Sequence, residues 1–144
     1  MTSVERPLWR AARLDDLGRV EPDGFWDEWA RTPGYGARWR SVGTDLGILG
    51  FGMNQYEADE GEELVVPHTE VDYGNQEEAY VLLRGRARFT CDGEQVELGV
   101  GEILYVRPEA MREATALESP TVVLMVGGTP GKPYEPWDYG KDGA

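Results

Sequence analysis

The residues best suited to chemistry lie in two short stretches of the chain. Residues 67–70 read PHTE and residues 76–81 read QEEAYV. His68 is the only histidine, which excludes a site with several imidazoles within one chain. Side chains two positions apart on a strand point to the same side, so His68 and Glu70 can both face an interior. Together with Glu78 they could bind one divalent ion such as Mn, Fe, Ni, Zn or Mg.

Arg112 would complicate a metal site if the fold brings it to the same interior, because a guanidinium cannot ligate a metal and its charge repels one. We expect Arg112 to pair with Glu70 or Glu78, since matched charges and hydrogen bonds make burial tolerable. Three hypotheses stay open: a metal-free polar pocket, a bound divalent ion, and a purely structural ion pair. In the pocket, Arg112 is the charge anchor for an anionic ligand and Glu70 hydrogen-bonds that ligand.

Tyr80 and Tyr105 could bring hydroxyl groups to the same interior. A catalytic site would then use His68 or Glu78 as the general base and Tyr80 as the general acid, with Tyr105 contacting the ligand. The alternative is that these tyrosines only cover one end of the core, with the ring buried and the hydroxyl in water.

The elements that must position these residues are short strands. From residue 46 onward, β-prone runs alternate with turn residues at the spacing of a sandwich or barrel. The pair Asp92-Gly93 predicts a type I′ hairpin, because both positions need a positive φ. Gly85 and the stretch 99–101 predict further reversals. We expect strands at 47–56, 63–68, 78–83, 86–91, 94–98, 102–107, 112–117 and 121–126.

Alternation within the strand at 86–91 predicts which side chains face the core. Ala87, Phe89 and Cys91 share one face, and the intervening arginines share the other. We therefore expect Cys91, the only cysteine, to be a small buried residue, and the arginines 84, 86 and 88 to be solvated.

The two ends of the chain differ in texture from the strands. Residues 1–45 are irregular, with one short helix predicted over residues 23–30, where Asp23 can cap the first turn. We expect this helix to pack on the larger body. Residues 128–144 are rich in Gly, Pro and aromatic residues and predict an extended tail lying on the barrel.

The stretches PHTE, EEAYV and GEILYVRP, the last at 101–108, resemble the two motifs of the cupin superfamily. His68 matches the first metal-binding histidine of that pattern, Glu70 replaces the second, Glu78 matches the glutamate, and Arg112 takes the last histidine position. The resemblance covers residues 46–127 and extends to small single-domain bacterial cupins of unassigned activity. It implies an all-β fold, an antiparallel β-barrel or double-sheet jelly roll, with a degenerate metal motif.

Charge and composition exclude several classes of partner. The formal net charge of −13 repels phosphate backbones and anionic membrane surfaces, so nucleic acid and membrane are not expected partners. The first residues contain no apolar stretch typical of a signal peptide, and no apolar run approaches the roughly 18 residues of a membrane span. These features predict a cytoplasmic protein. By analogy with single-domain cupins, we also expect a homodimer.

The sequence thus predicts a barrel pocket that binds a small polar or anionic molecule, with either no cofactor or one divalent metal. An enzyme built on it would be of the isomerase or dioxygenase type. The alternative is a non-catalytic, metal-free binding or regulatory module.

Overall fold

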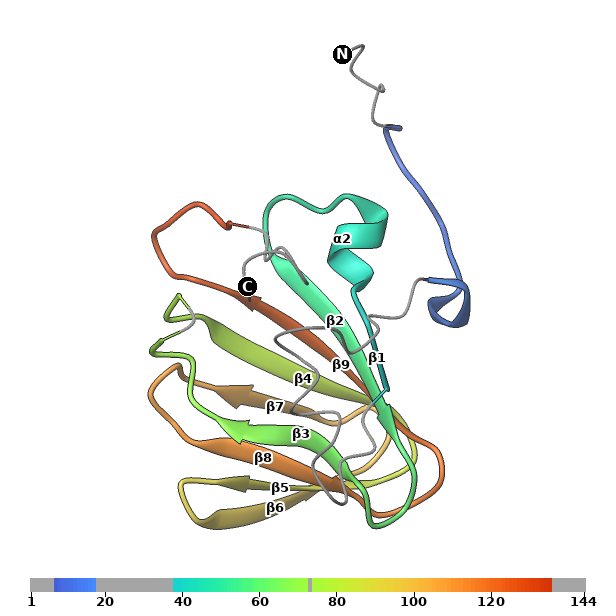
Figure 1. The fold of residues 1–144 in the computed structure, drawn as a ribbon, viewed down its shortest axis with the longest axis vertical. Helices are drawn as coiled ribbons and strands as arrows, with labels where there is room; N and C mark the ends of the chain where they lie inside the picture. The colour runs from blue at the N-terminus through green and yellow to red at the C-terminus, as the bar shows by residue number, and fades with distance from the viewer. Residues whose placement is uncertain (1–6, 18–37, 73, 136–144) are drawn as a thin grey trace, which may run out of the picture.

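Two antiparallel sheets face each other and enclose the core (Figure 1). The computed structural model describes residues 7–17, 38–72 and 74–135. Five strands form one sheet, in the order β1 (Arg38–Arg40), β2 (Gly52–Ala58), β9 (Thr121–Gly128), β4 (Glu77–Arg84) and β7 (Ile103–Val106). Four strands form the second, in the order β3 (Glu63–His68), β8 (Arg112–Ala116), β5 (Ala87–Cys91) and β6 (Glu94–Leu98). The predicted all-β jelly roll is confirmed.

The core lies between the inner faces of the two sheets. On β4 the buried positions alternate, with Glu78, Tyr80 and Leu82 facing inward. On the opposite sheet Phe89 of β5 and Ala114 of β8 are direct neighbours and almost fully buried. The ring of Tyr80 packs against that of Phe89, with centroids 5.2 Å apart. Polar side chains gather at one end of this interior, beyond Tyr80.

Turn residues fix the registers of the strands. Asp92 and Gly93 have φ values of 49° and 84°, which confirms the predicted hairpin between β5 and β6. Gly85 has a φ of 78°, and a Cβ there would lie 2.5 Å from the hydroxyl of Thr121. Only glycine fits this reversal, which joins β4 to β5.

The region before β2 differs from the prediction. A helix, α2 (Val42–Leu46), ends at Gly47 in the left-handed conformation, so β2 begins at Gly52 rather than at residue 47. Strand β1 precedes α2 and pairs with β2, which extends the sheet into the segment expected to be irregular. A short 3-10 turn, η1 (Leu14–Asp16), lies earlier. The helix predicted over residues 23–30 falls outside the described residues.

The three arginines at 84, 86 and 88 lie at or beside β5. Arg84 and Arg86 are exposed, as predicted, whereas Arg88 is half-buried. Arg86 forms an exposed ion pair with Glu97 at 2.7 Å. Among the described residues, no helix is long and apolar enough to cross a membrane.

Candidate functional site

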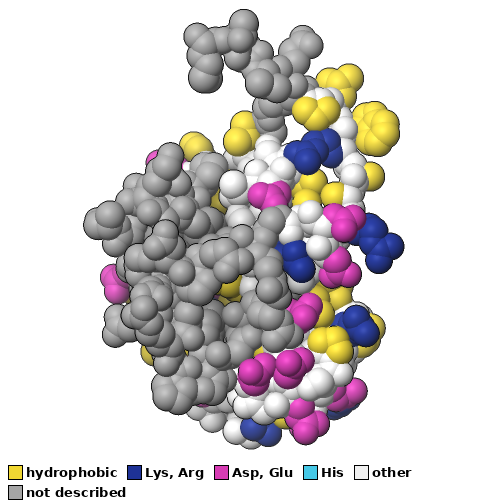
Figure 2. Space-filling model, turned by 45° about the vertical axis from the view of Figure 1, so that its right-hand side comes forward, with side chains coloured by type: hydrophobic (Ala, Val, Ile, Leu, Met, Phe, Trp, Pro, Cys, Tyr) yellow, Lys and Arg dark blue, Asp and Glu magenta, His cyan; other side chains and the backbone are white. Residues whose placement is uncertain are grey.

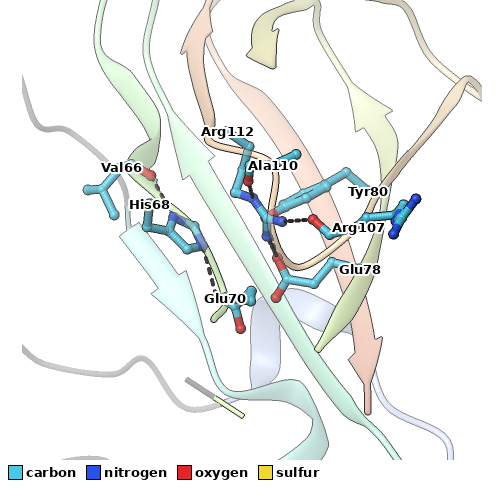
Figure 3. A network of polar contacts seen from close by, with 8 residues as sticks. All are labelled: Val66, His68, Glu70, Glu78, Tyr80, Arg107, Ala110 and Arg112. Atoms are coloured by element: carbon cyan, nitrogen blue, oxygen red, sulfur yellow. Dashed lines mark hydrogen bonds and ion pairs between the residues drawn. The ribbon is translucent and has the colours of Figure 1, made fainter. Parts of the chain in front are cut away.

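The polar end of the interior brings together residues from both sheets (Figure 3). His68 ends β3, and its direct neighbour across the pair is Arg112 at the start of β8. Glu70 follows two residues after His68. Glu78 and Tyr80 project from β4 of the opposite sheet. The structure thus assembles five of the six residues that the sequence singled out.

Arg112 is the most buried member of this group, with 0 % of its side chain exposed. Its Nη1 donates to Oε1 of Glu78 at 2.7 Å, its Nη2 to the carbonyl of Arg107 at 2.7 Å, and its Nε to the carbonyl of Ala110 at 3.1 Å. Every nitrogen of the guanidinium therefore has an acceptor within the protein. The expected pairing of Arg112 with Glu78 is present, and the same side chain also holds the 107–111 turn; its role as a charge anchor for a ligand stays a prediction.

Glu78 receives two hydrogen bonds on one carboxylate oxygen. The hydroxyl of Tyr80 donates to Oε1 at 2.6 Å, beside the bond from Arg112. The other carboxylate oxygen points away from Arg112 (Figure 3). Burial and the charge of Glu70 raise the pKa of Glu78, and its bonds to Tyr80 and Arg112 oppose that rise. Burial raises the pKa of Tyr80 well above its usual value, so this hydroxyl stays protonated and donates.

His68 has a defined orientation. Its Nδ1 lies 2.7 Å from the carbonyl oxygen of Val66, and a carbonyl can only accept, so Nδ1 carries a hydrogen. Its Nε2 lies 3.1 Å from Oε2 of Glu70. In a neutral imidazole this Nε2 would present a lone pair to a carboxylate. The pair is stable only with a cation between the two atoms, either a proton or a metal ion.

The pKa of His68 reflects this environment. Burial lowers the pKa of the imidazole, but the hydrogen bonds to Glu70 and Val66 and the charges of Glu70 and Glu78 outweigh it, so the pKa is raised overall. In the absence of metal, the proton is therefore held between His68 and Glu70 more firmly than in a free histidine.

The donor set fits a divalent ion. His68, Glu70 and Glu78 each offer one ligand atom, and these atoms all lie within 4.8 Å of one another. The Nδ1 bond to Val66 leaves Nε2 aimed at the group, an arrangement typical of metal-binding histidines. Glu78 keeps one oxygen that Arg112 does not use. The charge of Arg112 opposes a cation, but the two carboxylates outnumber it.

The 107–111 turn is fixed on both sides of the site. The amide of Glu70 donates to the carbonyl of Pro108 at 2.9 Å. On the other side, Asp92 accepts a hydrogen bond from the amide of Met111 and donates its own amide to the carbonyl of Met111. The carbonyl acceptors of this turn were missed by the sequence reasoning, because backbone groups leave no signal in the pattern of side chains.

Tyr105 is the predicted site residue that the structure does not bring into the group. It lies opposite Ala79, which alternates with the inward-facing Glu78 and Tyr80, so its ring points to the outer face of the sheet. The side chain is 59 % exposed, and its hydroxyl donates to Glu77. Expecting Tyr105 in the interior was wrong, because Tyr105 pairs with the outward-facing Ala79 and not with the inward-facing Glu78 one residue away.

Cys91 was expected to be buried. It lies opposite Arg112 but is only half-buried.

The fold is similar to that of known cupin structures. A search of solved structures finds a cupin protein from Bacteroides fragilis, at 20% identity, a TM-score of 0.62 and 92% coverage of both chains. It also finds a sugar phosphate isomerase of the cupin superfamily from Silicibacter pomeroyi, at 18% identity and a TM-score of 0.62, covering 84% of this chain and 77% of that one.

A third similar structure is KdgF from Halomonas sp., at 17% identity and a TM-score of 0.55, with 64% of this chain and 77% of that chain covered. No protein-family model matches the sequence, and no similar sequence was found among curated proteins. These likenesses show the fold: the chain has the architecture of a small cupin.

Proposed function

We propose that this chain is a small-molecule-binding cupin that holds one divalent metal ion at His68, Glu70 and Glu78 and uses the site to bind a compact anionic ligand. The observation that supports this proposal best is the 3.1 Å distance between Nε2 of His68 and Oε2 of Glu70, while Nδ1 of His68 is already bonded to the carbonyl of Val66. That geometry calls for a cation at the point where three ligand atoms converge.

The charges around the site support an anionic ligand. Glu70 and Glu78 carry two negative charges, and Arg112 carries one positive charge within a buried ion pair. A divalent ion would leave the group with a net positive charge of about one. In a poorly hydrated interior such an excess is best neutralised by an anion, which favours a carboxylate or phosphate ester as the ligand.

The site can be reached from the β3 side. The side chains of His68 and Glu70 are 20% and 10% exposed, whereas that of Arg112 is fully covered. A ligand would therefore approach past His68 and Glu70, with Arg112 and Tyr80 behind Glu78 keeping its carboxylate in place. When bound, the metal would supply a Lewis acid for the oxygen atoms of the ligand.

An isomerase is the type of enzyme that this site supports better than a dioxygenase. Non-heme iron dioxygenases commonly use two histidines with one carboxylate, and this chain has one histidine. The similarity to a sugar phosphate isomerase of the same fold points in the same direction.

Metal binding tests the proposal. Calorimetric titration of chelator-treated protein with MnCl₂ should show one ion per chain, and Glu70→Gln should weaken binding by at least about tenfold. Glu77→Gln is the matched control, because Glu77 bonds Tyr105 on the outer face and should leave the affinity unchanged. No binding by the wild-type protein, or equal weakening in both variants, would contradict the proposal.

A second candidate is a metal-free binding module. One proton between His68 and Glu70 would give two positive and two negative charges in the group, so a proton alone also neutralises it. In that case His68 would act in proton transfer or not at all, and the same titration would show no bound manganese.

We also propose that the chain forms a homodimer. Leu8 and Trp9 are 101% and 81% exposed, and hydrophobic side chains gather at the upper right of Figure 2, where the segment 7–17 lies. Ile103 is 63% exposed on the outer face of β7. Burying such residues against a second copy would remove apolar surface from water. Light scattering should give twice the mass of the chain, and a monomer mass would contradict this.

A further inference from the structure

Two glycines lie side by side on the inner face of the sheet, next to Glu78. Gly52 of β2 pairs directly with Gly127 of β9, and Gly127 pairs with Glu78 of β4. A Cβ on Gly127 would lie 3.1 Å from Cγ of Glu78. Directly paired residues point to the same face of a sheet. A side chain at position 52 would therefore point to the same interior as the side chain of Glu78.

A tyrosine occupies the space that the missing side chain of Gly52 leaves. A Cβ on Gly52 would lie 2.9 Å from the hydroxyl oxygen of Tyr134 and 3.2 Å from its ring. Tyr134 is half-buried and belongs to the segment that follows β9. This segment turns back toward the start of β2 (Figure 1). Glycine at position 52 is therefore what lets the ring lie on the inner face of the sheet.

The segment is held at this end of the molecule by its own contacts. The hydroxyl of Thr129 donates to the carbonyl of Gly74, and the amide of Lys132 donates to the carbonyl of Thr129 at 3.2 Å. Gly74 lies in the loop between Glu70 and Glu78. The loop that begins with Glu70 and leads to Glu78 on β4 therefore also holds the segment that carries Tyr134.

The phenol and the polar site are close enough to contact one small molecule. Tyr134 lies over Gly52, the Glu78 side chain lies over Gly127, and paired Cα atoms of antiparallel strands are about 5 Å apart. These spacings bring the hydroxyl of Tyr134 within about 11 Å of the Glu78 side chain. A compact molecule held at the carboxylates spans such a distance.

We infer that Tyr134 is a specificity-determining residue of the site, whose phenol hydrogen-bonds a hydroxyl group at the far end of a bound hydroxy acid. The inference rests on the proposed function, which places the carboxylate of that molecule at the metal. A phenol both donates and accepts hydrogen bonds, which suits a hydroxyl group rather than a second charged group. The ligand class is therefore a small carboxylic acid that carries hydroxyl groups along its chain.

The test is calorimetric titration of the manganese-loaded full chain with gluconate. Tyr134→Phe should weaken gluconate binding by about three- to tenfold, the loss expected for one neutral hydrogen bond, with manganese affinity unchanged. Tyr105→Phe is the matched control, because Tyr105 lies on the outer face, and it should bind gluconate as the wild type does. Glutarate, which has no hydroxyl groups, should bind Tyr134→Phe and wild type equally.

A second variant guards against indirect effects. Gly52→Ala keeps the phenol but displaces it, since the new methyl group would lie 2.9 Å from the hydroxyl, and it should weaken gluconate binding in the same direction. Equal gluconate affinity in Tyr134→Phe and wild type would overturn the role of Tyr134. Manganese binding without gluconate binding would overturn the ligand class.

Absence of manganese binding would instead overturn the proposed function. The same gluconate comparison, made on the metal-free protein, then decides the role of Tyr134: a loss confined to Tyr134→Phe and Gly52→Ala supports it, and equal or absent binding overturns it.

Discussion

The interior has an apolar end and a polar end, and the same strands build both. Strand β4 contributes Leu82 to the apolar end and Glu78 to the polar end, four residues apart on one face. Strand β8 likewise contributes Ala116 to one and Arg112 to the other. Burial at the apolar end stabilises the fold without specific partners. Burial at the polar end is tolerable only because each charged group has an assigned partner.

This difference means that a substitution at each end should have a different signature. At the apolar end it should change stability and leave ligand binding alone. At the polar end it should change binding, and stability as well wherever a buried charge loses its partner.

The largest effect is expected for Arg112→Ala. The change leaves Glu78 buried without its cation and removes the donors that bind the carbonyls of Arg107 and Ala110. We expect a loss of about 4 kcal/mol in the free energy of unfolding, measured by urea denaturation. Arg86→Ala breaks only the exposed pair with Glu97 and should leave the urea midpoint unchanged. Similar midpoints for the two variants would show that Arg112 does not hold the polar end together.

At the apolar end, Leu82→Ala should cost about 3 kcal/mol, because Leu82 is fully buried and its removal leaves a cavity. Manganese affinity of the folded variant should stay within twofold of the wild type, about the precision of such a titration. A large loss of affinity in Leu82→Ala would show that the two ends are not independent.

An intermediate effect is expected for Tyr80→Phe, which lies between the two ends. The ring and its contact with Phe89 remain, but Glu78 loses one of its two hydrogen bonds. The free energy of unfolding should fall by about 1 to 2 kcal/mol. Manganese affinity should also fall, because the carboxylate of Glu78 is held less firmly. A loss of stability with unchanged manganese affinity would show that the Tyr80 hydroxyl does not support the metal site.

The smallest effect concerns pH. In the metal-free protein, burial lowers the pKa of His68, but the hydrogen bonds to Glu70 and Val66 and the charges of Glu70 and Glu78 outweigh it, so the pKa is raised. A raised folded-state pKa stabilises the protein below the unfolded value, about 6.5, and this stabilisation is lost as the pH rises through the folded value. The free energy of unfolding should therefore decline slightly above pH 6.5, while manganese affinity rises because the metal replaces the proton.

Because His68 is the only histidine, its NMR titration reports this pKa directly. In Glu70→Gln the pKa should fall toward the ordinary value. An unchanged titration curve of His68 in that variant would show that Glu70 does not raise the pKa of His68.

The two ends also differ in how far the sequence predicts them. Alternation placed Ala87 and Phe89 in the core and the arginines between them outside, because a strand with one buried face has a period of two. The same period put His68 and Glu70 on one side of a predicted strand, although β3 ends at His68, and Glu78 was assigned from the resemblance to the cupin motif. The Asp92-Gly93 turn was predictable because its backbone needs positive φ values.

Contacts between distant segments were not predictable in the same way. Tyr105 was expected inside, but its orientation depends on the pairing with Ala79, which the sequence of β7 alone does not specify. Two of the three acceptors of Arg112 are backbone carbonyls of a turn, and Tyr134 lies on the inner face of the sheet only because position 52 of β2 is a glycine. These features arise from tertiary structure and have no local pattern.

The most direct test of the central claim is a crystal structure of the protein grown with MnCl₂, using anomalous diffraction to locate manganese. We expect one peak per chain, within coordination distance of Nε2 of His68 and of one oxygen each of Glu70 and Glu78, with Arg112 still bonded to Glu78. No peak at this position, with His68 Nε2 and Glu70 Oε2 still in direct contact at 3.1 Å, would contradict it.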